Sequence, residues 1–371
     1  MKILVAMSGG IDSSVVAHLL HRQGHELVGV RFTLWSDPLA PAMAQLLPSK
    51  CCNPQTAYRT RVVADTLGIP LHIVDLEKEF KEHVVDPYLE KHRHGLTPNP
   101  CIRCNREIKF GHLLRLMEEY GCDALATGHY ARVATERLPE GSNRFVLLEA
   151  ADVTKDQSYY LYGLSQEQLC RVILPLGTMT KAAVFALAKE FGVPHDEHYH
   201  ESMDLCFFPE KTPEAFLRRH LGEDLKPGAI VRRDGTVVGT HEGLPLYTVG
   251  QRRGLGIGGL RVPLEVVAKD VPSNRLIVAD KDTETVTHVH LSDLRWVSWT
   301  PEEGADVAFE CRTRSLSARR RGVLRFQGST GTFRFQSALP PQAAGQSLVL
   351  YRGPEIVGGG VIETSSLEPG F

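Results

Sequence analysis

Two groups of residues in this sequence have the types and the spacing that chemistry needs. The first is the run Ser8-Gly9-Gly10-Ile11-Asp12-Ser13-Ser14, which combines glycines, hydroxyls and one carboxylate. Glycines let a backbone approach an anion closely, and the N–H groups at a helix N-terminus attract phosphate. Asp12 could cap that helix or help to hold Mg²⁺ beside the phosphates. The run predicts a pyrophosphate-binding loop, and a simple capped turn is the alternative.

This loop differs from two common phosphate loops. It lacks the Gly-Lys-Ser/Thr ending of a Walker A loop, and it lacks the dinucleotide fingerprint. The string Ser-Gly-Gly-x-Asp-Ser instead resembles the PP-loop of ATP pyrophosphatases, which cleave ATP between the α and β phosphates and adenylate a substrate. Phe32, at the end of a neighbouring strand, either packs on adenine or belongs to the core. The expected ATP-binding residues are Ala6, Met7, Ser8, Gly9, Gly10, Ile11, Asp12, Ser13, Phe32 and Gly128.

The second group consists of cysteines. Cys101 and Cys104 follow Thr97-Pro98-Asn99-Pro100, which predicts a rigid turn and a loop ahead of a helix that begins near Asn105. A thiol near a helix N-terminus and beside arginines becomes more acidic, and therefore a better nucleophile or metal ligand. One CxxC without a second pair does not support a four-cysteine zinc site. Cys206 could approach this pair in space, or it could be an inert core cysteine.

The remaining cysteines bear on the cellular compartment. Eight cysteines, unevenly spaced over 371 residues, argue against a secreted disulfide framework and for thiols in a reducing compartment. Cys122, Cys170 and Cys311 lie in apolar or strand-like settings typical of packing residues, and the Cys51-Cys52 pair is a weaker signal. No run approaches the ~18 apolar residues of a membrane helix, and no signal peptide precedes the first strand-like run. We therefore expect a cytoplasmic protein with no membrane partner.

Both groups depend on the elements that position them. Short apolar runs alternate with helical patterns over residues 3–7, 13–21, 27–32, 57–67 and 71–74, and a further buried run covers 124–127. This rhythm predicts βαβαβ units and a parallel sheet with helices on both faces. Because ligands gather at the carboxyl ends of such strands, the loop after the first strand and Gly128 are expected on one edge of the sheet.

The length and texture of the chain predict several domains. A single core stops growing near ~250 to 300 residues, so 371 residues should divide. After about residue 207 the sequence changes to shorter strands with frequent turn signals. We expect an α/β, Rossmann-like PP-loop domain at 1–207, a small α+β linking domain at 208–275 and a β-barrel at 276–371.

The net charge of −2 does not by itself suggest a nucleic-acid partner, so any such signal must be local. The stretch from Arg312 to Arg325 carries six arginines and no acidic residue. Such a cluster suits phosphate contacts, although a solvated charged hairpin would have the same composition.

Ordered blocks across nearly the whole chain resemble those of the bacterial tRNA-specific 2-thiouridylases. The blocks are Met7–Ser13, Thr97–Pro100, Cys104–Phe110, Ala126–Tyr130, Lys155–Tyr159, Asp204–Phe207 and Gly250–Gly259. The resemblance implies ATP-dependent adenylation of the C2 oxygen of the wobble uridine, then sulfur transfer from a cysteine persulfide, with release of pyrophosphate and AMP. It also implies that Cys104 is the nucleophile, that Cys206 carries the persulfide, and that an external reductant reopens their disulfide.

The same resemblance implies a set of RNA contacts. Asn99, Pro100 and Cys101 would lie against the target base. The expected tRNA contacts are His129, Lys155, Asp156, Gln157, Arg314, Ser315 and Gln346. A solvated turn is the alternative for Asp156 and Gln157. The implied partners are tRNA, held at its anticodon region, and a protein that delivers sulfur.

The sequence also departs from the family pattern. Cys101 stands where some members have Asp, and Ser315 stands where an aromatic residue is common. Related thiolation enzymes hold an iron–sulfur cluster on three cysteines, and Cys101, Cys104 and Cys206 could do so for a 4Fe-4S cluster. A cluster-dependent mechanism therefore stays open beside the persulfide one. Two further alternatives are a PP-loop ligase, which needs no cysteines, and an RNA-binding module, which needs no PP-loop.

Overall fold

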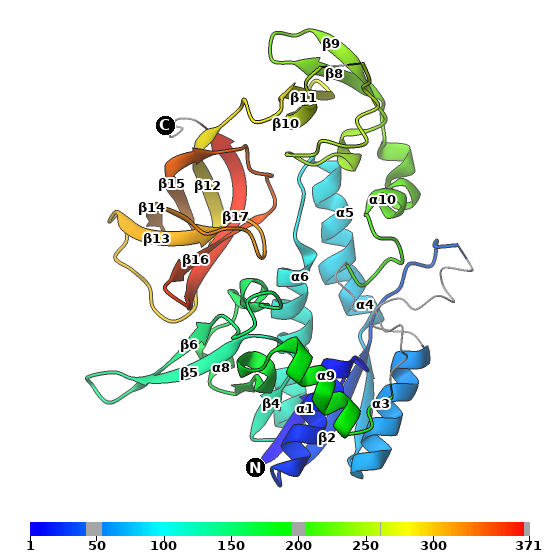
Figure 1. Ribbon diagram of the computed structural model, residues 1–371, viewed down its shortest axis with the longest axis vertical. Helices are drawn as coiled ribbons and strands as arrows, with labels where there is room; N and C mark the ends of the chain where they lie inside the picture. The colour runs from blue at the N-terminus through cyan, green and yellow to red at the C-terminus, as the bar shows by residue number, and fades with distance from the viewer. Residues whose placement is uncertain (42–53, 195–204, 260, 367–371) are drawn as a thin grey trace.

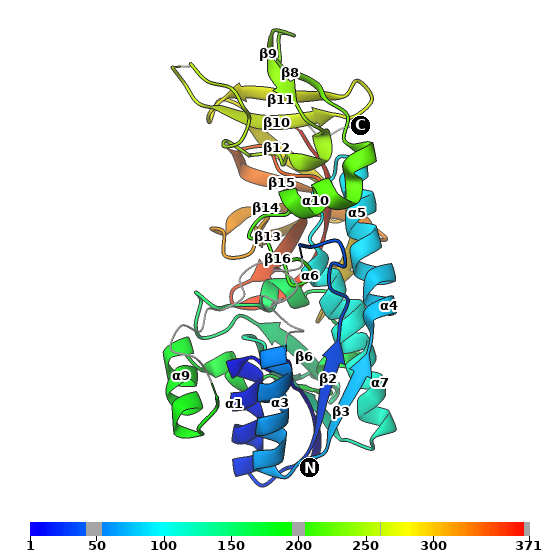
Figure 2. The ribbon, with the colours of Figure 1, turned by 90° about the vertical axis from the view of Figure 1, so that its right-hand side faces the viewer.

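The computed structural model describes residues 1–41, 54–194, 205–259 and 261–366. Figures 1 and 2 show an elongated molecule with a parallel sheet and its helices at one end, and a β-barrel and a small central sheet toward the other. The predicted fold class is confirmed. Cys51 and Cys52 lie outside the described residues.

The N-terminal domain is built on a five-stranded parallel sheet. In spatial order its strands are β3 (Leu71–Asp75), β2 (Glu26–Thr33), β1 (Lys2–Ala6), β4 (Ala124–Ala126) and β7 (Val172–Ile173). The helices around it include α1 (Ile11–Arg22), α3 (Pro54–Leu67), α7 (Gly111–Glu119), α8 (Gln166–Leu169) and α9 (Lys181–Glu190).

Alternation along β1 explains how the sheet is covered. Ile3 and Val5 pack with residues of α1, α3 and α9, whereas Leu4 packs on the opposite face with Leu113 and Met117 of α7. Successive strand residues point to opposite faces, so an almost continuous apolar strand can bury both. The expected two-sided sheet is therefore confirmed, and its carboxyl edge carries the loop after β1.

Two helical rods lead out of this domain. The first consists of α4 (Glu77–Phe80), η1 (Lys81–Val85) and α5 (Asp86–Arg93), and the second of α6 (Pro100–Arg103), η2 (Cys104–Phe110) and α7. Both η1 and η2 are π-helical. Phe80, Val84, Cys104 and Ile108 share one apolar cluster, so the two π-helical stretches are packed together. Such wide turns are rare and often mark functional sites.

The central unit is a four-stranded sheet beside a helix. Its elements are α10 (Glu214–Leu221), η5 (Gly222–Asp224), β8 (Gly228–Arg232), β9 (Val237–His241), η6 (Leu244–Leu246), β10 (Leu264–Asp270) and β11 (Arg275–Asp280). Because β11 pairs with both β8 and β10, the sheet continues to Asp280, beyond the boundary expected at 275.

The C-terminal region is a closed antiparallel barrel. Its strands are β12 (Val286–Trp296), β13 (Val307–Arg312), β14 (Arg320–Gln327), β15 (Thr330–Leu339), β16 (Ser347–Arg352) and β17 (Glu355–Ser366). Pairing of β12 with β17 closes it. A hairpin of the N-terminal domain, β5 (Arg132–Arg137) and β6 (Asn143–Leu148), extends the same sheet through β6 and β17.

Two short helices complete the described elements, η3 (Ser158–Leu161) and η4 (Pro175–Thr178). Tyr159 of η3 donates a hydrogen bond to the carbonyl oxygen of Ser347 (2.8 Å), so the barrel is also tied to the N-terminal domain there. In the described ranges, no helix has the length and apolar character needed to span a bilayer.

Candidate active site

The loop after β1 has the geometry of an anion cradle. Gly9 adopts φ 77°, and a Cβ at this position would lie 2.1 Å from the carbonyl oxygen of Thr56 in α3, so only glycine fits. Gly10 caps α1 without any side-chain hydrogen bond to the first turn. The N–H groups at the start of α1 therefore stay available for a ligand, and the helix dipole favours an anion there.

The side chains of the loop are mostly turned inward. Ser13 and Ser14 donate their hydroxyls to the carbonyl oxygen of Gly10 (3.2 and 3.0 Å), and Ile11 is fully buried. Met7 is 2% exposed, and its backbone N–H donates to Val30 (2.8 Å). Contacts from this loop to a nucleotide would thus come chiefly from backbone N–H groups.

Two buried arginines that the sequence analysis did not single out bind the backbone carbonyl groups of this loop. Arg31 donates to the carbonyl oxygen of Ser8 (2.9 Å), and Arg59 donates to that of Gly9 (2.7 Å). Both are about 6% exposed. They draw the carbonyl groups away from the cradle, and their positive charge lies just beneath it, which favours a bound polyphosphate.

Asp12 has partners that were also missed. Its Oδ1 accepts hydrogen bonds from Lys181 Nζ (2.7 Å) and from the hydroxyl of Tyr130 (2.9 Å). Lys181 is the first residue of α9, and its side chain is 11% exposed. An ammonium group is thereby brought to the loop from a distant part of the chain. A Thr180 helix cap was the local sequence signal near it.

The structure places the other two expected nucleotide residues at the same edge. A Cβ on Gly128 would lie 3.1 Å from the backbone nitrogen of Ser13, so glycine permits a close approach of the segment after β4 to α1. Phe32 is half-buried, with its ring 6.4 Å from that of His112. Phe32 does pack against the core, while its contact with adenine stays a prediction.

The helix that carries the cysteine pair begins earlier than expected. The predicted start near Asn105 is wrong, because α6 begins at Pro100 and continues without a break into η2. Asn99 is the N-cap, and its side chain accepts a hydrogen bond from the backbone N–H of Cys101 (3.1 Å). Cys101 is therefore in the first helical turn, and Cys104 lies one turn further and is 6% exposed.

The arginines near the two cysteines are paired with carboxylates. Arg103 and Arg106 both donate to Glu107 (2.8 and 2.6 Å), and Arg106 also pairs with Asp293 of the barrel (3.1 Å). Their effect on the nearby thiols is therefore shared with two carboxylates.

The structure places Cys206 against the apolar cluster that contains Cys104. Phe207 and Phe208 belong to the same cluster. All six described cysteines are thiols rather than disulfides. Cys122 and Cys311 are buried, as expected, but the packing role expected for Cys170 is wrong, because Cys170 is exposed at the end of α8.

The described residues contain no group of three His, Cys, Asp or Glu side chains arranged to hold a metal ion. In a 4Fe-4S cluster each cysteine binds a different iron atom, so a cluster held by Cys101, Cys104 and Cys206 stays a prediction.

Cys101 lies among tyrosines. Burial is the main reason that the pKa values of Tyr88 and Tyr160 are raised, and the nearby Cys101 thiol raises both further. The Tyr160 hydroxyl also hydrogen-bonds the side chain of Ser315, which comes from the barrel. Pro100 is buried, and Asn99 is half-buried. Asn99, Pro100 and Cys101 therefore lie near the boundary between the N-terminal domain and the barrel, and their contact with the target base stays a prediction.

The residues expected to contact tRNA divide into inward- and outward-facing ones. Asp156 is 3% exposed and accepts hydrogen bonds from Ala150 N (2.9 Å) and Ser158 Oγ (2.8 Å), so the alternative of a solvated turn is wrong for it. Burial raises the pKa of Asp156. Gln157 accepts from the backbone N–H of Tyr130 (3.0 Å). Lys155 is partly exposed on the adjoining turn.

His129 follows Gly128 at the sheet edge. Its Nδ1 lies 2.8 Å from Thr127 Oγ1, and its ring packs 5.6 Å from that of Phe110. Burial and the ammonium group of Lys109 lower the pKa of His129 to about 3, so the imidazole is neutral at neutral pH. A neutral ring offers a base or ribose hydrogen bonds rather than charge.

Gln346 of the barrel contacts the segment that precedes α6. Its Nε2 donates to the carbonyl oxygen of Thr97 (2.7 Å), and the backbone N–H of Thr97 donates to Ala344 (2.7 Å). Thr97 Oγ1 also lies 3.4 Å from Thr248 Oγ1 of the central unit. All three parts of the molecule therefore meet just before Asn99.

A cleft of about 980 Å³ lies between the central unit and the barrel. Residues lining it include Gln251, Arg252, Arg253, Thr313, Arg314 and Arg320. Arg314 is exposed there and donates to the carbonyl oxygen of Val249 (3.4 Å). The lining of the cleft is both polar and apolar, and two members of the arginine cluster contribute to it.

The arginine cluster is not uniform. Arg312 and Arg319 pair with Glu149 of the N-terminal domain, and both guanidinium groups stack on Tyr351 (5.3 and 4.4 Å from the ring centre). These two therefore hold the barrel in place. Arg320, Arg321 and Arg325 are exposed. The solvated-hairpin alternative thus fails for part of the cluster.

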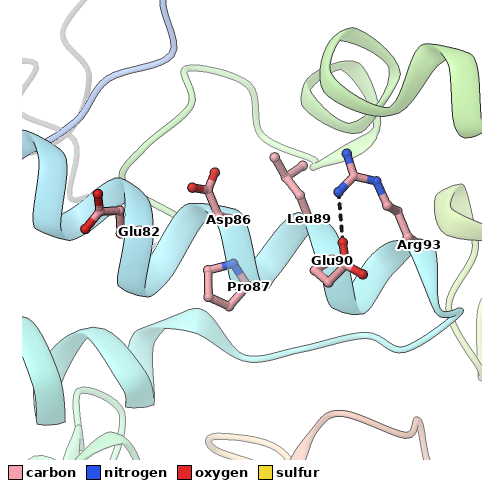
Figure 3. A pocket seen from close by; sticks show the side chains of 6 residues that line it. All are labelled: Glu82, Asp86, Pro87, Leu89, Glu90 and Arg93. Atoms are coloured by element: carbon pink, nitrogen blue, oxygen red, sulfur yellow. Dashed lines mark hydrogen bonds and ion pairs between the residues drawn. The ribbon is translucent and has the colours of Figure 1, made fainter.

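A smaller pocket of about 450 Å³ lies on the outer side of η1 and α5 (Figure 3). Its lining includes the carboxylates Glu82, Asp86 and Glu90, and Figure 3 shows Glu90 paired with Arg93. None of the expected site residues lines this pocket.

Comparisons with known proteins cover the whole architecture. The family described as "tRNA methyl transferase HUP domain" matches residues 1–210, "tRNA methyl transferase PRC-barrel domain" matches 214–280, and "Aminomethyltransferase beta-barrel domain" matches 286–362. A protein named tRNA-specific 2-thiouridylase MnmA from Geobacter metallireducens is 41% identical over 99% of this chain and 98% of its own length. One of the same name from Amoebophilus asiaticus is 36% identical over 100% and 97%.

Solved structures are more distant. A 4-thiouridine synthetase–RNA complex with bound ATP is similar over 60% of this chain and 50% of its own, at 19% identity and a TM-score of 0.33. A predicted subunit of tRNA methyltransferase from Methanocaldococcus jannaschii is similar over 60% and 87%, at 20% identity and a TM-score of 0.33.

Proposed function

This chain belongs to the family of tRNA-specific 2-thiouridylases, and we propose how its residues perform that family's ATP-dependent sulfur transfer to a uridine of tRNA. One observation carries the proposal. Cys206 packs on the apolar cluster that contains Cys104, the first residue of η2. A thiol pair and an anion cradle are thereby present in one molecule, as adenylation followed by sulfur transfer requires.

The first half-reaction uses the loop after β1. Backbone N–H groups at the start of α1 bind the phosphates of ATP, and Lys181 supplies positive charge beside Asp12. The C2 oxygen of the uridine attacks the α-phosphorus, the bond to the bridging oxygen breaks, and pyrophosphate leaves. The product is an adenylated base whose leaving group is AMP.

Mg²⁺ fits this site through Asp12. The Asp12 carboxylate accepts both of its hydrogen bonds at Oδ1, and Oδ2 accepts none from the described residues. Oδ2 would therefore hold the ion together with phosphate oxygens. When bound, Mg²⁺ would neutralise charge that develops on the pyrophosphate.

The second half-reaction uses the two cysteines. The terminal sulfur of a persulfide on Cys206 attacks C2 of the base, and AMP leaves with the original oxygen. The Cys104 thiolate then attacks Sγ of Cys206, which releases the thiolated base and leaves a Cys104–Cys206 disulfide. A dithiol reductant reopens that disulfide by exchange, and a sulfur-delivering protein recharges Cys206.

For RNA binding we propose the cleft lined by Arg314 and Arg320, with the target uridine splayed out toward Asn99 and Cys101. Gln346 and Ser315 would act from the barrel side of that site, and His129 and Lys155 from the sheet side. The anticodon as the region bound, the sulfur donor and a cytoplasmic location stay predictions.

The test compares three serine variants by mass spectrometry of tRNA nucleosides and by pyrophosphate release that depends on tRNA. Cys104→Ser and Cys206→Ser should yield no 2-thiouridine, because each removes one sulfur of the relay. Both should still release pyrophosphate in the first turnover, because adenylation precedes sulfur transfer. Cys170→Ser, whose thiol is exposed on α8, is the control and should match wild type. Formation of 2-thiouridine by Cys206→Ser would remove the persulfide assignment.

The cluster-dependent alternative has a separate measurement. Protein purified without oxygen should be assayed for iron and for its absorbance spectrum. Full activity in colourless, iron-free protein would exclude it, whereas iron in proportion to activity would replace the persulfide steps above.

A further inference from the structure

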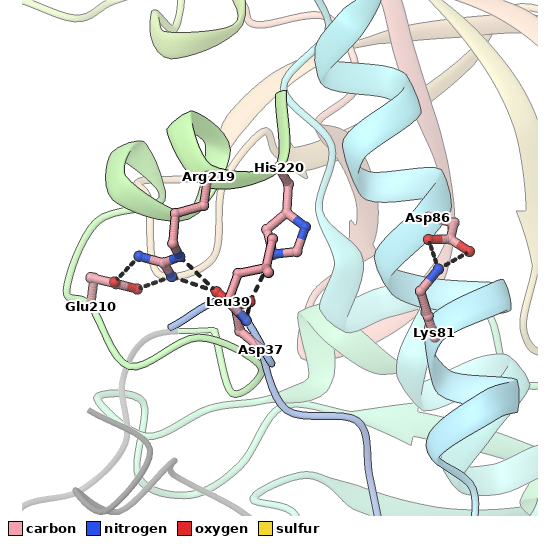
Figure 4. A network of polar contacts seen from close by, with 7 residues as sticks. All are labelled: Asp37, Leu39, Lys81, Asp86, Glu210, Arg219 and His220. Atoms are coloured by element: carbon pink, nitrogen blue, oxygen red, sulfur yellow. Dashed lines mark hydrogen bonds and ion pairs between the residues drawn. The ribbon is translucent and has the colours of Figure 1, made fainter. Parts of the chain in front are cut away.

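A network of charged side chains lies beside the apolar cluster that contains Cys104. The proposed reaction assigns no role to these side chains. It consists of Asp37, Glu210, Arg219 and His220 (Figure 4). Asp37 belongs to the segment that follows β2, Glu210 to the segment that follows Cys206, and the other two to α10. Figure 4 shows Arg219 between the two carboxylates.

Asp37 is the buried centre of this network. Its side chain is fully buried, and Oδ1 accepts hydrogen bonds from His220 Nε2 (2.8 Å) and from the backbone N–H of Leu39 (2.9 Å). Its Oδ2 accepts from Nε of Arg219 (2.9 Å). A buried carboxylate is stable only when donors of this kind surround it, so its position is closely defined.

Arg219 joins this centre to the Cys206 segment. While one edge of the guanidinium group binds Asp37, Nη2 also donates to Glu210 Oε2 (3.2 Å) and Nη1 to Glu210 Oε1. The fork of donors on an arginine can hold two carboxylates at once, which a lysine ammonium cannot do with the same geometry. The segment after Cys206 is thereby tied both to α10 and to the chain leaving β2.

The apolar residues of the same segment dock on the same helix. Phe208 stacks on Phe216 of α10 (4.9 Å), and Phe207 packs against Phe216 (5.4 Å) and Tyr88 (5.4 Å). Phe216 and Arg219 are three residues apart, so they lie on one face of α10. Cys206 therefore precedes a short segment that is fixed to α10 by two aromatic rings and one ion pair.

We propose that Arg219 is a positioning residue for sulfur transfer, which holds the segment after Cys206 so that its thiol stays close to Cys104. This inference rests on the roles given above to Cys104 and Cys206. The network includes Asp37, which follows β2, and the last residues of β2 border the proposed nucleotide site. Loss of the Arg219 contacts should reduce the frequency with which the two sulfurs meet. It should leave adenylation intact.

The experiment measures the effective concentration of the Cys104 and Cys206 thiols by equilibration of the full-length protein with reduced and oxidised glutathione. Two thiols give up two protons and two electrons to one oxidised glutathione, which becomes two reduced ones. Arg219→Met keeps the apolar stem and removes the fork, and Glu210→Gln keeps the size and removes the charge. Arg93→Met is the matched control, since it removes another arginine ion pair near α10, with Asp224.

We expect Arg219→Met and Glu210→Gln to lower both the effective concentration and kcat for thiolation by roughly tenfold, with an unchanged KM for tRNA and unchanged pyrophosphate release in the first turnover. Arg93→Met should match wild type in all four quantities. Should Arg219→Met fail to fold, Glu210→Gln decides alone. Wild-type effective concentration in Glu210→Gln would overturn the inference. If Cys206→Ser is active, the proposed function fails instead, whatever the glutathione result.

Discussion

The carboxylate of Asp12 lies where three parts of the N-terminal domain meet. α1 supplies Asp12, α9 supplies Lys181, and the segment after β4 supplies Tyr130. Lys181 also lies over the rings of Tyr130 and Phe185 (5.5 and 5.0 Å), so its ammonium is held from several sides. Such support orients a phosphate-binding group before the substrate arrives, which is how a site lowers the cost of reorganisation.

We predict that Lys181→Met lowers kcat/KM for ATP by about 10- to 100-fold, because the loop loses an ammonium and the Asp12 carboxylate loses its counter-charge. The affinity for tRNA should not change, since Lys181 lies at the nucleotide loop and not in the cleft. Steady-state AMP release at varied ATP measures the first quantity, and filter binding of labelled tRNA measures the second.

Lys189→Met is the control for this prediction. Lys189 is exposed near the other end of α9, so the same helix loses one positive charge away from the loop. Equal kcat/KM for ATP in Lys181→Met and Lys189→Met would show that Lys181 serves only to pack α9.

The sequence could predict the loop glycines and Asp12, because a strand, a glycine turn and a helix start are local features. It could not predict Lys181, Arg31 or Arg59. Their approach to the loop depends on the order of strands in the sheet and on which helices cover each face, and neither is written in the neighbouring residues. Lys181 looks in the sequence like any residue that follows a helix cap.

At the scale of elements, the cysteine helix shows how a local signal can be interpreted in two ways. Pro98 and Pro100 suggested a rigid turn, yet Pro100 occupies the first turn of α6, where a missing N–H costs nothing and the fixed φ suits a helix. Asn99 completes the start as N-cap. The consequence is chemical, because Cys101 and Cys104 are held one helical turn apart by the backbone rather than presented on a flexible loop.

A second contact between elements contains a buried lysine. Lys269 of β10 packs near the end of α5, where a Cβ on Gly95 would lie 3.8 Å from its Cδ. Its Nζ is buried and has no hydrogen-bond partner among the described residues, as is also true of His92 Nε2 in α5. Burial lowers the pKa of Lys269 to about 7, and burial together with Lys269 lowers that of His92 to about 3.

We predict that Lys269→Met stabilises the protein at pH 7. The pKa of this amine is lower in the folded chain than the 10.5 of an unfolded one, so between these values only the unfolded chain binds the proton. Stability therefore falls as pH drops from 10.5 to 7, and a methionine removes a penalty on the order of 4 kcal/mol. The advantage of the variant should shrink toward pH 10.

The measurement is the thermal midpoint of the variant and of wild type at pH 7 and pH 10. Lys281→Met, which removes an exposed lysine just after β11, is the control and should change stability by no more than about 0.5 kcal/mol at either pH. A Lys269→Met midpoint below that of wild type at pH 7 would contradict a buried, unpaired ammonium.

At the scale of the whole molecule, the sheet of the barrel continues into a hairpin of the N-terminal domain. The hairpin β5–β6 adds to β17, and Glu149, just after β6, binds Arg312 and Arg319 of the barrel. The texture of the sequence predicted the barrel, because short strands and turns are local. It could not predict this junction, since pairing between β6 and β17 joins segments far apart in the chain, and arginines that fix a domain look like arginines that bind phosphate.

The structure distinguishes the arginines that fix the barrel from those that line the cleft, and neighbouring residues on β14 allow a direct test of RNA binding. Arg320 lines the cleft beside Arg314, whereas Arg321 points to the other side of the strand and pairs with Glu310 (3.5 Å). Each phosphate contact releases condensed counterions, so Arg320→Gln should lower the slope of log Kd against log salt by about 0.9 and weaken tRNA binding at low salt.

Arg321→Gln serves as the matched control, because it removes the same charge from the same strand and is 76% exposed in the wild-type protein. Its salt slope should equal that of wild type if the cleft, rather than the overall charge of the barrel, binds RNA. Titrations of fluorescent tRNA at several salt concentrations give both slopes. Equal slopes for the two variants would mean that β14 attracts RNA only through its general field, and the bound RNA would then have to be placed outside the cleft.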